Sequence, residues 1–135
     1  MCPSSDVRQQ VQDLITVTTQ ADYTLVKIGG TFDDELHIEE QDDVLVQIGA
    51  VEAATRLLVD LTEVETIDSW GEGLVQDLAE DKVLSLGGRV AVAEDPARPE
   101  IAIGLKARLK EYEQARVMFF QSSEVAVGWL LGGGS

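Results

Sequence analysis

Ser69 is the residue of this chain whose type and surroundings could best support chemistry. It lies in VETIDSWGEG, residues 64–73, between Asp68 and Trp70. A serine hydroxyl can cap a helix, attack a carbonyl when a base activates it, or accept a phosphoryl group. The spacing S-x-x-E fits a capping box, in which Ser69 caps a helix and Glu72 bonds back to the serine N–H. We therefore expect Ser69 to cap a helix, which contributes about 1 kcal/mol.

Nucleophilic catalysis by Ser69 would need partners that the sequence does not offer. His37 is the only histidine, and acids surround it. Ile67 stands two residues before the serine, so the G-x-S-x-G turn of many serine hydrolases is missing. We therefore expect no catalytic residues and no enzyme activity.

Metal and nucleotide sites are not predicted either. Residues 33–43, DDELHIEEQDD, hold seven acids but lack the D-x-[DN]-x-[DN]-G pattern of a calcium loop. The glycine pair at 29–30 is not part of a phosphate-binding loop, and GEG at 71–73 lacks the third glycine of a dinucleotide fingerprint. The acidic run is expected to be a solvated helix start, and no cofactor or metal is expected.

The charge of the chain favours a basic partner. There are 25 acids against 10 bases, a formal net charge of -15. Such an excess repels nucleic-acid phosphates and anionic membrane surfaces. No apolar run approaches the roughly 20 residues that span a bilayer, and the single cysteine, Cys2, allows no internal disulfide. We expect a cytoplasmic protein that binds neither nucleic acid nor membrane.

Hydrophobic periodicity predicts alternating strands and helices. Strands are expected at 14–18, 23–28, 57–61, 89–93 and 117–120, the first two joined as a hairpin and the second ended by Gly29 and Gly30. Helical spacing follows over 44–55, 69–86, from Pro99 to 112, and after Ser122 or Ser123. Gly87 and Gly88 should stop the second of these helices.

The predicted element order is therefore β-β-α-β-α-β-α-β-α. It indicates an α/β fold, with a mainly parallel sheet of about five strands packed by about four helices. We expect a single domain over residues 13–131, preceded by an extension at 1–12 and followed by a flexible tail at 132–135.

The stretch RLLVDLTEVETIDSWGEGLV, followed by GGRVAVAE and a helix that begins at a proline, resembles the STAS domain of bacterial anti-sigma factor antagonists. The similarity also includes GGTFDDE after the second strand. The resemblance implies a regulatory switch in transcription and stress response. The unmodified antagonist would bind an anti-sigma factor that is also a serine kinase, release a sigma factor, and dissociate once its serine is phosphorylated.

By this resemblance, Ser69 matches the phospho-acceptor of the family and Asp68 matches the acid before it. Partner contacts are predicted at Asp33, Asp68, Ser69, Trp70 and Glu72. The Trp70 ring would be either an exposed interface anchor or folded onto the sheet or helix. Trp70 and Glu72 replace residue types that are commoner in simple antagonists, and the large aromatic looks more like the single-domain STAS proteins of stressosomes. The alternative function is thus a non-phosphorylated scaffold subunit of a stressosome or lipid-transport complex, with related STAS proteins or a second copy as partner.

Overall fold

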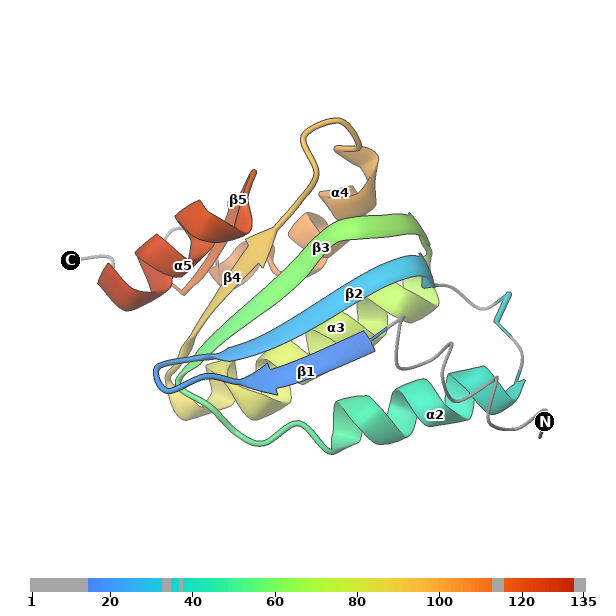
Figure 1. Ribbon diagram of the computed structural model, residues 1–135, viewed down its shortest axis with the longest axis horizontal. Helices are drawn as coiled ribbons and strands as arrows, with labels where there is room; N and C mark the ends of the chain where they lie inside the picture. Colours follow the sequence, from blue (N-terminus) through green and yellow to red (C-terminus); the bar gives the residue numbers. More distant parts are fainter. Residues whose placement is uncertain (1–14, 33–34, 37, 113–115, 133–135) are drawn as a thin grey trace.

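The computed structural model describes residues 15–32, 35–36, 38–112 and 116–132. Within these residues five strands form one sheet in the order β1-β2-β3-β4-β5 (Figure 1). The strands are β1 (Ile15–Thr19), β2 (Thr24–Phe32), β3 (Arg56–Ile67), β4 (Arg89–Ala93) and β5 (Val117–Phe120). β1 and β2 form an antiparallel hairpin, and all later pairs are parallel. The predicted mainly parallel sheet with an N-terminal hairpin is therefore confirmed.

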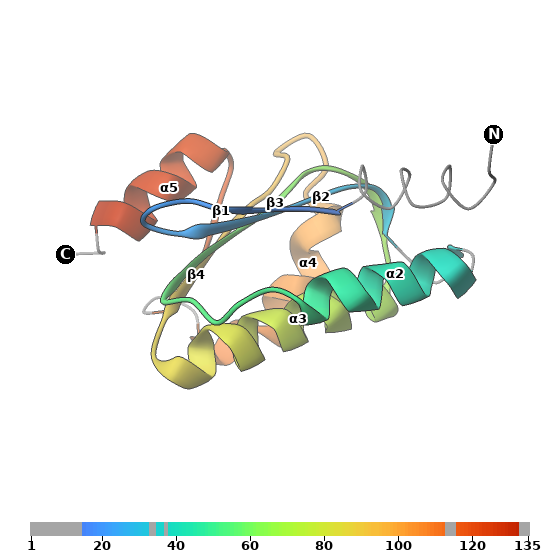
Figure 2. The same cartoon turned by 60° about the horizontal axis from the view of Figure 1, so that its bottom comes forward.

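Helices cover both faces of the sheet. They are α2 (Ile38–Gly49), α3 (Ser69–Lys82), α4 (Glu100–Arg108) and α5 (Ser123–Gly132). Figure 2 shows α2, α3 and α4 on one face and α5 on the other. The predicted element order is confirmed for the described residues. The proposed 1–12 extension and most of the 132–135 tail lie outside them.

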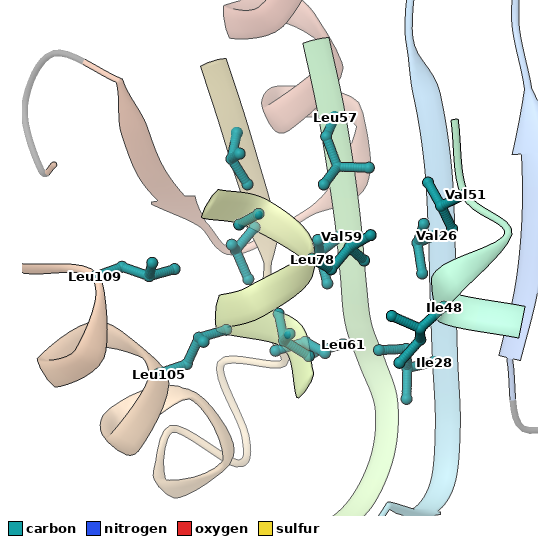
Figure 3. Close-up of a cluster of buried hydrophobic side chains, with 14 of the residues drawn as sticks. Val26, Ile28, Ile48, Val51, Leu57, Val59, Leu61, Leu78, Leu105 and Leu109 are labelled. Carbon is teal, nitrogen blue, oxygen red and sulfur yellow. The ribbon is translucent and has the colours of Figure 1, made fainter. Parts of the chain in front are cut away.

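The main core lies between the sheet and the three-helix layer (Figure 3). β3 alternates across the sheet: Leu57, Val59 and Leu61 enter this core, whereas Leu58 packs under α5. This two-sided burial explains why the strand is a nearly continuous apolar run in the sequence. Asp60 is only 8% exposed, and its carboxylate accepts hydrogen bonds from the backbone N–H and the hydroxyl of Thr62, at 2.9 and 2.6 Å.

The strands that lead to the serine are longer than predicted. Gly29 and Gly30 do not end β2, which continues to Phe32. Residues 62–67, which follow the strand predicted at 57–61, form the second half of β3. The two strands pair through register shifts on either side of the glycines, and Gly30 takes a φ of 68°. A glycine pair in a strand pattern can thus mark a bulge, because glycine alone tolerates that backbone at little strain.

Three predicted helices also end earlier than their apolar spacing suggested. α4 ends at Arg108 and is followed by a separate 3-10 turn over Lys110–Tyr112. α2 ends at Gly49, although Val51, which lies beyond the helix, is still buried in the core. α3 ends at Lys82, and a separate 3-10 turn over Leu84–Leu86 is closed by Gly87 in the left-handed region at φ 84°. The glycines therefore do not stop α3 as predicted; Gly87 closes the turn after it. Of the two serines predicted as a cap for the last helix, Ser122 is the cap, because its hydroxyl accepts from the Val125 N–H at 3.2 Å.

Candidate functional site

Ser69 stands where β3 leaves the sheet and α3 begins. It is exposed, and it is the first residue of α3. β2 ends beside it, because Phe32 pairs with Ile67 in the sheet register. The serine therefore lies at the carboxyl edge of the parallel strands, the edge at which open α/β sheets commonly bind their ligands and partners.

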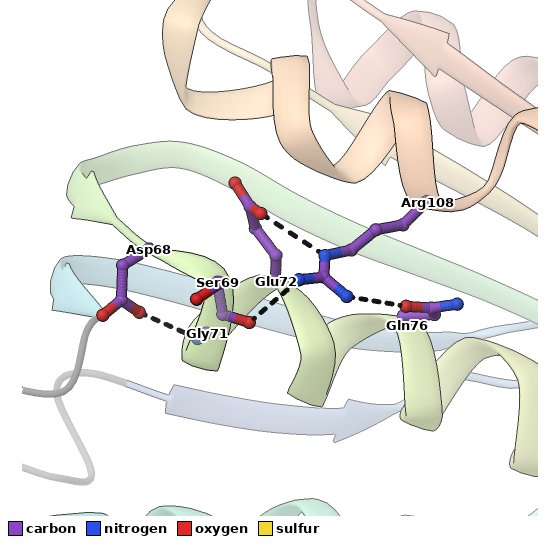
Figure 4. A network of polar contacts seen from close by, with 6 residues as sticks. All are labelled: Asp68, Ser69, Gly71, Glu72, Gln76 and Arg108. Carbon is purple, nitrogen blue, oxygen red and sulfur yellow. Dashed lines mark hydrogen bonds and ion pairs between the residues drawn. The ribbon is translucent and has the colours of Figure 1, made fainter.

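Asp68, and not Ser69, caps α3, so the predicted capping box is wrong. Asp68 has extended backbone, with φ −127° and ψ −171°, and its carboxylate accepts from the Gly71 N–H at 3.1 Å (Figure 4). A capping residue needs this non-helical backbone, whereas Ser69 already belongs to the helix. Among the described residues, the Ser69 hydroxyl accepts no hydrogen bond from the free backbone N–H groups at the start of α3.

Glu72 turns away from the serine N–H that the capping box would have given it. Its carboxylate meets the Arg108 guanidinium of α4, with Nε and Oε1 3.4 Å apart. Arg108 also donates to the Gln76 side-chain oxygen at 3.1 Å and to the Ser69 backbone oxygen at 3.4 Å. One cation thus joins the first two turns of α3 to the end of α4 (Figure 4).

The Glu72 side chain is well covered. It is 17% exposed, against 34% for Arg108, and it lies across Gly104 of α4. A β-carbon at position 104 would overlap the Glu72 carboxylate, so glycine leaves the space that this carboxylate fills.

The Trp70 ring is folded onto the sheet instead of standing free. It is half-buried against the main core, and its centroid lies 5.7 Å from that of Phe32 at an interplanar angle of 48°. Of the two alternatives predicted for this ring, the structure has the packed one. The packing of Trp70 on Phe32 therefore helps to hold the turn that carries Ser69, and the ring stays only partly accessible.

Gly71 lets the start of α3 approach the end of β2. A β-carbon at position 71 would collide with the Phe32 carbonyl oxygen and lie 2.7 Å from the Phe32 ring and 3.0 Å from Ile67. Sequence reasoning missed both Gly71 and Arg108. The glycine in the first turn of a predicted helix was a usable signal, whereas nothing local to Arg108 indicated its role.

The remaining predicted site features fall partly outside the described residues. Asp33 and His37 lie outside them, so the predicted partner contact at Asp33 stays a prediction, as do those at Asp68, Ser69, Trp70 and Glu72. Within the part of the chain that the structure describes, no group of three or more His, Cys, Asp or Glu is placed to hold a metal ion. In the same part, no helix has the length and apolar character to cross a bilayer.

Comparison with known proteins identifies the fold. No protein-family model and no curated protein match the sequence. Among solved structures, an anti-sigma factor antagonist from Mycobacterium paratuberculosis matches 87% of this chain and 92% of its own, with a TM-score of 0.64 and 18% identity. The anti-sigma factor antagonist SpoIIAA in its unphosphorylated form matches 87% of this chain and 98% of its own, with a TM-score of 0.56 and 17% identity. The chain has the fold of these proteins, the STAS fold.

Proposed function

We infer that this STAS-fold chain is an anti-sigma factor antagonist-type regulator. It binds an anti-sigma factor that is also a serine kinase, and phosphorylation of Ser69 ends the complex. The observation that carries the proposal is that the Ser69 side chain is exposed and its hydroxyl is not used by the helix cap. Ser69 is exposed at the first position of α3, and the helix cap does not use its hydroxyl because Asp68 makes the cap.

A phosphate at Ser69 would change this surface strongly without unfolding it. It adds about −1.5 to −2 charges. The partial positive charge at the start of α3 favours it locally, whereas the neighbouring carboxylates of Asp68 and Glu72 repel it. A partner packed on the neutral serine would have to desolvate a dianion, which is expensive unless basic groups pair with it. Loss of binding therefore needs no rearrangement of the fold.

The proposed partner is basic overall, although not where it covers Ser69. The chain carries a net charge of -15, and several of its cations are engaged by its own groups. In the transfer step the serine oxygen forms a bond to the γ-phosphorus of ATP, the bond to ADP breaks, and the hydroxyl proton goes to a base of the kinase. No catalytic group of this chain is required.

The test uses the whole chain with a purified anti-sigma factor of the serine-kinase class and MgATP. Intact-mass spectrometry should show the gain of one phosphate, and peptide mapping should locate it at Ser69. Ser69→Ala should abolish the gain. Ser85→Ala is the matched control, because Ser85 is also exposed but lies in the turn after α3.

Binding supplies the second half of the test. Ser69→Glu should weaken the complex with the same kinase at least tenfold in calorimetry, a loss of about 1.4 kcal/mol. An equally phosphorylated Ser69→Ala chain would refute the assignment of the site. Tight binding without any phosphate transfer would instead support the scaffold alternative.

A further inference from the structure

Arg108 is the cation that contacts the first turn of α3 among the described residues. Its guanidinium is shared by three acceptors, the Glu72 carboxylate, the Gln76 amide oxygen and the Ser69 backbone oxygen, at 3.4, 3.1 and 3.4 Å. Charged hydrogen bonds between a guanidinium and an oxyanion usually measure about 2.7–2.9 Å. The present bonds to Glu72 and Ser69 are long, so a stronger acceptor nearby can replace them.

Such an acceptor would arise on Ser69 itself. Arg108 already touches this residue through its backbone oxygen, while Figure 4 shows the hydroxyl pointing away from Arg108 to the side of Asp68. A phosphate in that orientation would face the Asp68 carboxylate. Rotation about the first side-chain torsion moves it between staggered positions, and like-charge repulsion favours the one nearer to the guanidinium.

We propose that Arg108 receives the phosphate on Ser69 and thereby transmits the modification to α4. This inference rests on the proposed phosphorylation of Ser69. The guanidinium exchanges the Glu72 carboxylate for the phosphate, and its planar fork can bind two phosphate oxygens at once through two N–H groups. Arg108 is thus a positioning residue for the switch, and the kinase partner need not supply the cation that holds the phosphate.

The exchange also changes the contact between α3 and α4. Glu72 is 17% exposed and lies across Gly104. A covered carboxylate that loses its cation is costly, so Glu72 turns outward to water and leaves α4. The phosphate at the start of α3 thereby alters the surface of α4 as well as its own surroundings.

The experiment uses the whole chain with phosphoserine installed at position 69 during translation, so no kinase is involved. The second ionisation of the phosphate is followed by phosphorus NMR as the pH is varied. The charged described groups that face Ser69 are Asp68 before α3, Glu72 on α3 and Arg108 on α4. The carboxylates raise the pKa of the phosphate and the guanidinium lowers it, so Arg108→Gln should raise this pKa.

Lys110→Gln is the matched control. It removes the same charge two residues later, from an exposed side chain in the short turn over Lys110–Tyr112. It should leave the phosphate titration close to that of the parent chain. Equal titration curves for the Arg108→Gln and parent chains would overturn the proposal, as would equal effects of the two glutamine variants.

Urea unfolding gives an independent readout. It compares the effect of the substitution with and without the phosphate, so a general loss of stability in the variant cancels. Arg108→Gln should lower the equilibrium constant for folding in both chains. The decrease should be about tenfold larger in the phosphorylated chain than in the unmodified chain, as expected for the loss of a charged hydrogen bond. Amide exchange in α4 should also quicken on phosphorylation in the parent chain. Additive effects of the two changes, or unaltered exchange in α4, would refute the coupling. Because the phosphate is installed without a kinase, either result is separate from the kinase test of the proposed function.

Discussion

Replacing Gly71 by alanine should destabilise the chain, although alanine is the better helix former. A β-carbon at this position would collide with the Phe32 carbonyl oxygen and lie 2.7 Å from the Phe32 ring. A backbone oxygen cannot rotate out of the way as a side chain can. Such overpacking costs about 3 kcal/mol, and the helix propensity of alanine returns about 0.5–1 kcal/mol. The expected net loss is about 2 kcal/mol.

Gly73→Ala is the matched control in the same helix. A β-carbon there would meet only an Arg108 nitrogen at 4.0 Å, an ordinary contact distance. The helix propensity should then act alone and stabilise the chain by about 0.5–1 kcal/mol. The two variants carry the same chemical change two residues apart, yet their effects should have opposite signs.

Urea unfolding followed by circular dichroism measures both variants. With a slope of about 1.5 kcal/mol per M, a difference of about 3 kcal/mol separates the two midpoints by about 2 M. Gly71→Ala should also change the environment of Trp70, which packs on the same phenylalanine, and its fluorescence reports this. A Gly71→Ala chain as stable as the parent would refute the close approach of α3 to β2 on which the placement of Ser69 depends.

Two other predictions concern the cap and a tyrosine. Asp68→Ala should cost about 1 kcal/mol in urea unfolding, and Ser69→Ala less than about 0.5 kcal/mol; the reverse order would restore Ser69 as the cap. The Tyr112 hydroxyl donates to the Glu80 carboxylate at 3.0 Å, and this bond raises the pKa of Tyr112 above its usual 10.0. Its stabilising effect is therefore full below the unfolded-state pKa and lost as the pH rises through the folded-state pKa. Glu80→Gln should lower the pKa of Tyr112 in an ultraviolet titration, and an unchanged midpoint would contradict the contact.

The sequence predicted the element order and several boundaries because these depend on local patterns. β4 and β5 have the bounds that their apolar runs indicated, and Gly87 ends its turn in the left-handed region as a helix-stopping glycine should. The motif over residues 56–75 predicted the STAS fold, which the structural comparison confirms. Each of these signals is carried by residues that are close together in the chain.

Predictions failed where strand pairing competes with local preference. Gly29 and Gly30 have the composition of a turn, and residues 62–66 are more polar than the apolar run before them. Both segments nevertheless extend β2 and β3, because each strand supplies the other's backbone hydrogen bonds. The same extension sets Asp68 in extended backbone at the end of β3, which makes Asp68 the cap of α3. The S-x-x-E pattern could not reveal this, since aspartate and serine cap helices about equally well.

The sequence by itself thus determined the layered α/β architecture and marked Ser69, through its motif, as the predicted phospho-acceptor. The tertiary structure decided which groups surround that serine. Arg108 contacts Glu72, which is 36 positions away in the sequence. Gly71 allows α3 to approach the end of β2, and Gly104 leaves space on α4 for the Glu72 carboxylate. Periodicity shows which face of a helix is buried, but the partner of one side chain follows only from how the helices dock.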